Sequence, residues 1–260
     1  MKRAASNIGW TGQEDEQVWQ LMHQLGYTGI EIAPTRIVPQ NPYSCPAAAA
    51  LFAGVMQQKY GLEVVSMQSI WYGQQGNIFD AQQAKELEDY TRSAIEFGAS
   101  CRCRNLVFGC PRNRTMPEGA DPQMGRDFLS RIGWMAAQRQ MVIGLEANPP
   151  IYGTNFITTT QEAFDMVKEV DSPGLGVTLD VGTMIAQQER PHSFAKDLEY
   201  VSHVHISEPY LAPIEPRALH KELAMMLKAV GYKGYVSLEM KAAGLAELER
   251  SLTYLAEVFN

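Results

Sequence analysis

The segment Leu25-Gly26-Tyr27-Thr28-Gly29-Ile30-Glu31 has a counterpart near the other end of the chain, Val230-Gly231-Tyr232-Lys233-Gly234-Tyr235-Val236. In both, apolar residues at helical spacing lead up to a glycine, and a second glycine three positions later opens a short β-like run. A glycine just past the last helical turn is a typical C-cap, because that position often has a positive φ. Both segments therefore predict a helix that ends and a strand that begins.

Short apolar runs of this kind recur along the whole chain and alternate with longer amphipathic segments. We predict eight strands: Ala4–Gly9, Gly29–Ala33, Glu63–Gln68, Asn105–Gly109, Val142–Ala147, Gly176–Asp180, Val201–Ser207 and Tyr235–Met240. Continuous apolar runs such as Leu106-Val107-Phe108 are typical of parallel strands that are covered on both faces. Eight βα units without a Gly-x-Gly-x-x-Gly motif after the first strand favour a closed (β/α)₈ barrel over an open dinucleotide-binding sheet. We expect residues 1–260 to form one such domain.

The composition narrows the class of protein further. An apolar content of 45% and a charged content of 20% are ordinary for a soluble globular domain. The formal net charge of -7 disfavours nucleic acid as a partner. The N-terminal residues Met1–Asn7 lack the apolar region of a signal peptide, and no apolar run approaches the ~20 residues that span a bilayer. We therefore expect a cytoplasmic protein with neither a nucleic-acid nor a membrane partner.

The four cysteines are too few to staple a chain of this length, and a reducing cytoplasm would keep them as thiols. A zinc site of Cys101, Cys103 and Cys110 is a weaker alternative, because the Cys-x-Cys spacing is poor and a fourth ligand is missing. The sequence leaves the roles of these three cysteines open.

Four consecutive predicted strands carry an ionisable residue at or near their C-terminal ends, where barrels of this kind place their active sites. These residues are Glu146, Asp180, His205 and Glu239. Taken singly, each could cap a helix or be a hydrogen-bonded core residue. Together, in apolar surroundings, three carboxylates and an imidazole require a cation among them. This ligand set suits a divalent ion such as Mn²⁺, Mg²⁺ or Co²⁺, of which we expect Mn²⁺.

The order Glu, Asp, His, Glu at intervals of 34, 25 and 34 residues resembles the xylose-isomerase-like barrel superfamily. Within it, the chain looks most like ketose 3-epimerases and the sugar phosphate isomerase/epimerase group, and the resemblance includes the opening phrases Ser6–Trp10 and Gly29–Ile32. It implies a metal that holds a ketone oxygen and a neighbouring hydroxyl of a small-molecule sugar. It also implies that Glu146 and Glu239 flank the substrate. One glutamate removes a carbon-bound proton to give a cis-enediolate, and the other returns a proton from the opposite face.

Three positions depart from the pattern of ketose 3-epimerases. Their substrate-binding His, Glu and Arg are replaced here by Thr183, Tyr152 and Leu211. The metal ligands and the acid/base pair are kept while these contacts are lost. We therefore expect a ketosugar or a modified sugar as the substrate, and a free ketohexose is disfavoured.

Other polar residues that follow the strand ends are candidates for substrate binding. They are Gln68, Arg112, Asn148, Tyr152, Glu208 and Lys241. Arg112 and Arg114 could together grip a phosphate or a sugar acid, or they could pair with Glu118 or Asp121 in a solvated loop. His203 has no assigned role.

Alternative functions use the same barrel. An inosose-type dehydratase would expel a β-hydroxyl from the same enediolate, and a non-catalytic barrel would only bind a sugar. A DNA-repair endonuclease of the endonuclease IV type is disfavoured, because it needs three metal ions, more His and Asp ligands and a basic surface. Association into a homo-oligomer through helix faces such as Leu219–Val230 is left open.

Overall fold

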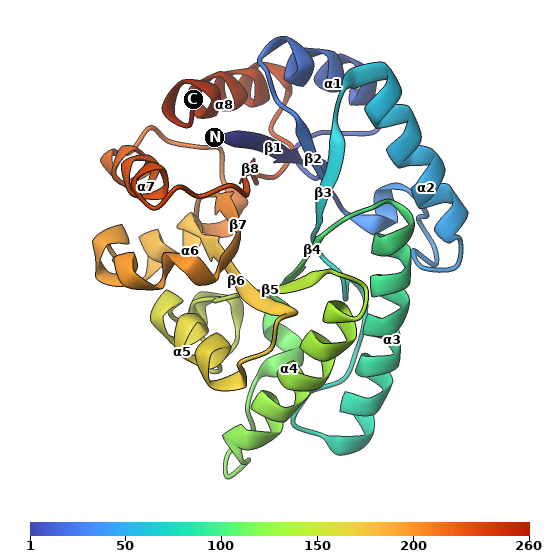
Figure 1. Cartoon of the computed structure of the whole chain (residues 1–260), viewed down its shortest axis with the longest axis vertical. Coiled ribbons are helices and arrows are strands. Elements are labelled where there is room, and N and C mark those ends of the chain that lie inside the picture. The colour runs from blue at the N-terminus through green and yellow to red at the C-terminus, as the bar shows by residue number, and fades with distance from the viewer.

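Eight parallel strands close into a barrel, in the order β1 to β8, in a computed structural model that describes residues 1–260 (Figure 1). The barrel is closed by β1 and β8, which pair in the register Ala4 with Ser237 and Ala5 with Leu238. The strands are β1 (Lys2–Ser6), β2 (Gly29–Ile32), β3 (Glu63–Met67), β4 (Asn105–Phe108), β5 (Val142–Glu146), β6 (Leu175–Asp180), β7 (Val201–Ile206) and β8 (Tyr235–Leu238). The predicted (β/α)₈ architecture is confirmed.

A ring of helices surrounds these strands, and the two ends of the chain lie close together (Figure 1). The helices are α1 (Asp15–Gln24), α2 (Pro46–Val55), α3 (Ala81–Ser100), α4 (Pro122–Ala137), α5 (Thr160–Val170), α6 (Val181–Ala186), α7 (Ala218–Ala229) and α8 (Leu245–Val258). The N-terminal amine donates to the carbonyl oxygen of Phe259 at 3.4 Å. None of the helices is both long and apolar enough to cross a membrane.

The predicted strands are all present, and their ends differ from the prediction by at most three residues. The largest difference is in β1, which we predicted at Ala4–Gly9 and which spans Lys2–Ser6. The chain turns after Ser6, because Gly9 N–H donates to the Ser6 carbonyl at 3.1 Å. The two basic residues that open β1 join the ladder by pairing with β8, a contact that an apolar pattern does not reveal. Gly26 and Gly231 have φ of 73° and 68°, as predicted for helix C-caps.

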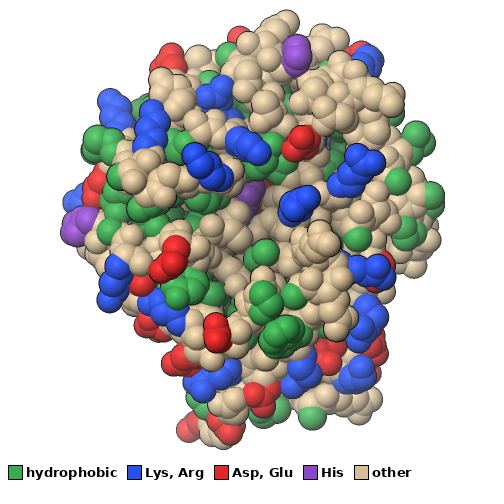
Figure 2. Space-filling model, viewed as in Figure 1, with side chains coloured by type: hydrophobic (Ala, Val, Ile, Leu, Met, Phe, Trp, Pro, Cys, Tyr) green, Lys and Arg blue, Asp and Glu red, His purple; other side chains and the backbone are tan.

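The barrel interior is polar over part of its length. The amide of Asn105 donates to the Ser66 hydroxyl at 3.1 Å and accepts from the Ser202 hydroxyl at 2.9 Å. Thr178 and Ser237 are further polar residues that are buried in the strands. The large apolar cluster instead fills the space between the strands and the helices, with fully buried residues such as Phe128. On the outside, side chains of both charge signs are interspersed over the face drawn in Figure 2.

Candidate metal centre

The four residues predicted as metal ligands meet at the C-terminal ends of β5 to β8. Glu146 and Asp180 are the last residues of β5 and β6, His205 is the penultimate residue of β7, and Glu239 follows β8 directly. Strand register places Asp180 opposite His205. Glu146 lies opposite Thr178, two residues before Asp180, and Ser237, two residues before Glu239, lies opposite His205. One ligand atom from each of the four side chains lies within 4.8 Å of the others.

His205 lies at the centre of this cluster and is fully buried. Its Nδ1 is 3.0 Å from Oε1 of Glu146 and 3.2 Å from Oε2 of Glu239. Asp180 is held in place by two donors: Thr183 N–H donates to Oδ2 at 2.7 Å, and the hydroxyl of Ser207 donates to Oδ1. The cluster is therefore oriented by its neighbours as well as by the strands.

The electrostatics of the cluster favour a cation. Among these residues alone, burial and the neighbouring Glu146 carboxylate raise the pKa of Asp180 to about 6. Burial raises the pKa of Glu239 to about 7. Burial works against a charged His205, but Glu239 and Glu31 raise its pKa well above the ordinary value. These shifts arise because several carboxylates lie close together in a buried site, where ionised carboxylates are unfavourable without a cation.

The donor set fits one divalent ion. Three carboxylates and one imidazole are ligands for Mn²⁺ or Mg²⁺ rather than for a thiolate-binding metal. Donor atoms that lie about 3 Å apart match the spacing of neighbouring ligands around an ion with bonds of about 2.1 Å. The cluster could therefore hold a metal ion.

A cavity of about 230 Å³ opens above the cluster, and Glu146, Asp180 and Glu239 line it. Four of the six residues that we predicted for substrate binding also line it, namely Gln68, Asn148, Tyr152 and Glu208. Leu211 lines the cavity too, so two of the three positions that depart from ketose 3-epimerases face the same space. Thr183, the third, is buried and donates to the Ala147 carbonyl at 2.8 Å.

The structure does not bring Arg112 and Lys241 to the cavity. Both residues are exposed and neither is among the residues that line it. Arg112 lies in the 3₁₀ helix η3 (Pro111–Arg114), whose turn directs Arg112 outward and Arg114 inward. The backbone N–H of Lys241 donates to the Leu211 carbonyl at 2.9 Å, which fixes the main chain and leaves the side chain in solvent.

Arg114 is fully buried, and it is not the solvated partner of Glu118 or Asp121 that we considered. Its Nη2 donates to the Glu146 carbonyl at 2.8 Å and to Oδ1 of Asn148 at 2.9 Å. Burial lowers the pKa of Arg114 to about 10. The guanidinium therefore stays charged at neutral pH, and its hydrogen bonds hold the main chain at Glu146 and the side chain of Asn148 at the end of β5.

The cysteines do not form a metal site. Cys101 and Cys103 are buried thiols that donate to backbone carbonyls of Gly98 and Asn105. Cys110 lines the cavity instead, and burial raises its pKa to about 12. All four cysteines are free thiols.

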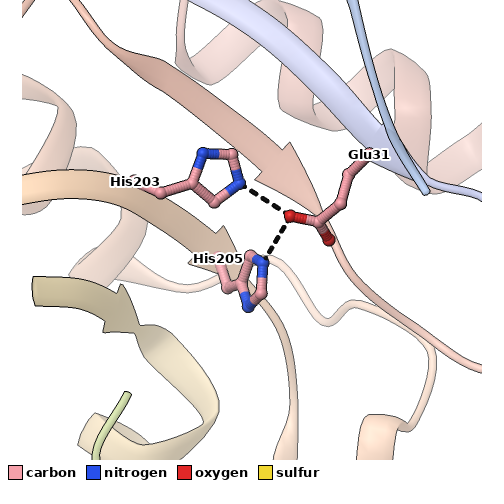
Figure 3. A group of neighbouring side chains, drawn as sticks. All are labelled: Glu31, His203 and His205. Carbon is pink, nitrogen blue, oxygen red and sulfur yellow. Dashed lines mark hydrogen bonds and ion pairs between the residues drawn. The ribbon is translucent and has the colours of Figure 1, made fainter. Parts of the chain in front are cut away.

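The sequence analysis missed Glu31, the third residue of β2. Its carboxylate is fully buried and faces both histidines of β7 (Figure 3). Oε2 of Glu31 is 2.9 Å from Nε2 of His205 and 2.9 Å from Nε2 of His203. Burial alone would raise the pKa of Glu31, but the two imidazoles hold it below its ordinary value. The signal was present in the sequence, since Glu31 is an ionisable residue inside an apolar strand.

Solved structures with this fold include several enzymes of sugar chemistry. D-Psicose 3-epimerase from Clostridium cellulolyticum superposes with a TM-score of 0.80 at 17% identity, over 100% of this chain and 98% of that one. The 3-keto-D-glucoside 4-epimerase of E. coli gives a TM-score of 0.75 at 19% identity, over 99% and 98%. The probable 3-DHS dehydratase of Bacillus anthracis gives 0.69 at 18%, over 99% and 98%. At such identities the likeness establishes the shared fold.

Sequence comparison is consistent with this fold. An uncharacterised protein of Methanocaldococcus jannaschii is 31% identical over 123 residues, which is 44% of this chain and 41% of that protein. The match thus spans less than half the length of that relative. A family model described as xylose isomerase-like TIM barrel matches residues 19–258. With its closed eight-stranded barrel, the chain belongs to the xylose isomerase-like TIM barrel family.

Proposed function

We propose that the protein is a divalent-metal-dependent epimerase or isomerase of a ketosugar or a modified sugar. The observation that carries this proposal is the convergence of Glu146, Asp180, His205 and Glu239 beneath a cavity that the two glutamates line. The four residues would hold the metal, for which Mn²⁺ is the best candidate and Mg²⁺ or Co²⁺ are alternatives. When bound, the ion would stabilise negative charge that develops on the substrate oxygens.

The acid/base work falls to Glu146 and Glu239. They come from β5 and the end of β8, and both contact Nδ1 of His205, so their carboxylates border the same small space. One glutamate takes the carbon-bound proton next to the ketone, which leaves a cis-enediolate. The other returns a proton to the opposite face and so inverts the carbon.

The cavity walls indicate the kind of substrate. Gln68 and Asn148 offer amides that can bind sugar hydroxyls, while Tyr152 and Leu211 form a more apolar edge. Glu208 is less free, because both of its oxygens accept from Arg217 at 2.7 and 2.6 Å. This mixture suits a sugar with an added group better than a free ketohexose. The structural relatives named as epimerases of D-psicose and of a 3-keto-D-glucoside support a ketosugar as the substrate class.

Solvent exchange tests the proposal. Protein saturated with Mn²⁺ is incubated in D₂O with a panel of ketoses and keto-glycosides, and the products are followed by NMR. We expect deuterium at the inverted carbon of at least one substrate. In Glu239→Gln and Glu146→Gln, at saturating Mn²⁺, the exchange rate should fall by about 10²- to 10⁴-fold, which is the usual contribution of a positioned acid or base. Glu249→Gln, at an exposed position of α8, is the matched control and should keep the wild-type rate.

Other outcomes favour other functions. An unsaturated or deoxy product in the same spectra would identify a dehydratase, like the probable 3-DHS dehydratase of Bacillus anthracis. Substrate binding without any exchange would indicate a sugar-binding barrel or an isomerase that works by hydride shift. Full exchange in Glu239→Gln would overturn the assignment of the two glutamates.

A further inference from the structure

Glu31 is fully buried, contacts His205 of the candidate metal centre and is not among the residues that line the cavity. It extends from β2 toward β7, and β1 and β8 lie between these two strands around the barrel (Figure 3). His203 and His205 are two residues apart on β7, so their side chains project to the same face of the strand. One carboxylate oxygen, Oε2, meets Nε2 of both rings at 2.9 Å.

A fully buried carboxylate is costly unless it is paired and hydrogen-bonded. The partners of Glu31 are these two imidazoles, and its second oxygen, Oε1, has no hydrogen-bond partner. The two contacts differ in quality. The contact with His205 has hydrogen-bond geometry, whereas Nε2 of His203 is close to Oε2 but is not aligned for a hydrogen bond. His205 is therefore the principal partner of Glu31.

We propose that Glu31 is the positioning residue of the metal centre: it accepts Nε2–H of His205 and so directs Nδ1 of that ring toward Glu146 and Glu239. A neutral imidazole carries its proton on one nitrogen and a lone pair on the other. A proton that is held on Nε2 by Glu31 leaves the lone pair on Nδ1, where a metal needs it. His203 packs edge-on against the His205 ring, with centroids 5.1 Å apart, and limits its rotation.

A second metal ion among Glu31, His203 and His205 is the competing explanation of this cluster. Such an ion would need Nε2 of His205 as a ligand while Nδ1 serves the first ion. The ring would then have to lose its last proton, which is far more costly than keeping it in a hydrogen bond. Our proposal therefore predicts one bound metal ion per chain.

Metal binding, measured apart from catalysis, tests the proposal. Isothermal titration with Mn²⁺ compares the wild type with Glu31→Gln and Glu31→Leu. The amide oxygen of Gln can still accept Nε2–H but lacks the charge, and Leu can do neither. We expect affinity to fall about tenfold in Glu31→Gln and about a hundredfold in Glu31→Leu, the range typical of groups that support a metal ligand. Glu88→Gln, at a buried carboxylate on α3 that pairs with Arg131, is the matched control and should bind as the wild type does.

A second readout separates positioning from a merely structural role. In Mg²⁺-loaded protein with ¹⁵N-labelled histidine, long-range ¹⁵N–¹H spectra should show His205 protonated on Nε2 alone. Because ligation through Nδ1 keeps the proton on Nε2 in any metal-loaded protein, the readout in Glu31→Leu is the Nε2–H proton resonance of His205. This resonance should move upfield when its carboxylate acceptor is removed, in protein that remains folded. If Glu31→Leu does not fold, the intermediate loss of affinity in Glu31→Gln still tests the proposal.

The inference rests on the proposed metal centre, and the two can fail separately. If the wild type binds no Mn²⁺, both the proposed function and the role of Glu31 are overturned. If the wild type binds one ion and the Glu31 variants bind it equally well with an unchanged Nε2–H resonance of His205, only the role of Glu31 is overturned. Two ions per wild-type chain would likewise overturn it in favour of a second metal site.

Discussion

The side-chain amide of Asn148 donates a hydrogen bond to Oε2 of Glu146 at 3.1 Å. Its carbonyl oxygen accepts from Arg114 at 2.9 Å, so the guanidinium fixes which way the amide faces. Asn148 therefore links a buried cation to a carboxylate of the proposed acid/base pair. This link restrains the position of Glu146 at the edge of the cavity.

Removing this link should impair turnover more than folding. A hydrogen bond to a charged group contributes about 1.5–3 kcal/mol, so Asn148→Ala should lower the rate of solvent deuterium exchange by about 10- to 100-fold. Asn41→Ala, on an exposed loop, is the matched control. A wild-type rate in Asn148→Ala would show that Glu146 does not depend on this contact.

Gly109, directly after β4, allows the carboxylate of Glu146 to approach the main chain. A Cβ added at this position would lie 2.6 Å from Oε2 of Glu146 and 3.2 Å from Oδ1 of Asn148. Because the nearest atom is the end of a flexible side chain, Gly109→Ala should fold but should displace the carboxylate. A shift of about 1 Å can cost about 100-fold in rate, so we expect a loss of that order in exchange and weaker Mn²⁺ binding.

The control for this substitution is Gly54→Ala in α2, where an added Cβ meets nothing within 4 Å. It should keep full activity and raise the free energy of unfolding by up to about 1 kcal/mol, because alanine is the better helix former. Equal activity in Gly109→Ala and Gly54→Ala would contradict the proposed crowding at Glu146.

The sequence predicted the part of the site that follows from strand order. Glu146, Asp180 and His205 each interrupt an apolar strand near its C-terminal end, and parallel register places Asp180 opposite His205 and Glu146 within two residues of Asp180. Glu31 has the same sequence signature on β2. It was missed because its role depends on a contact across the barrel with β7, which the local pattern does not contain.

The loop residues could not be predicted in the same way. Arg112 and Arg114 look alike in the sequence, yet one is exposed and the other fully buried. The difference arises from the turn of η3, which begins after Cys110 with an unusual φ of 46°. Whether a loop side chain is buried depends on where the loop folds back onto the barrel, and hydrophobic periodicity in the sequence does not predict that position.

Metal affinity should depend on pH in one direction. The pKa values of Asp180 and Glu239, raised to about 6 and about 7, mean that these carboxyls bind protons near neutrality and must lose them to bind a cation. Affinity should therefore fall as the pH falls. For Glu239 alone, the loss between pH 8 and pH 6 is about tenfold.

Titration calorimetry with Mn²⁺ at pH 6, 7 and 8 measures this dependence. Repeating each titration in buffers with different ionisation enthalpies counts the protons that are released. An affinity that does not change over this range, with no proton release, would show that the carboxylates are already ionised at pH 6.

Glu208 and Arg217 form a pair that should stabilise the loop over the cavity. Glu208 is buried, with 4% of its surface exposed, and Arg217 binds both of its oxygens. Arg217→Met would leave a buried carboxylate without its cation, which costs about 3–5 kcal/mol for a fully buried pair. Because the Arg217 side chain is 37% exposed, we expect a smaller loss, about 2 kcal/mol, in the free energy of unfolding measured with urea.

The double variant Glu208→Gln/Arg217→Met separates the lost pairing from lost packing. If the unpaired charge is the cause, the neutral amide at position 208 should recover a large part of the stability, and Arg217→Met alone should be the least stable protein. Arg139→Met provides the exposed counterpart, since Arg139 and Glu96 are both about half exposed and their pair should contribute less than about 1 kcal/mol. Similar losses in Arg217→Met and in the double variant would instead assign the effect to the packing of the arginine side chain.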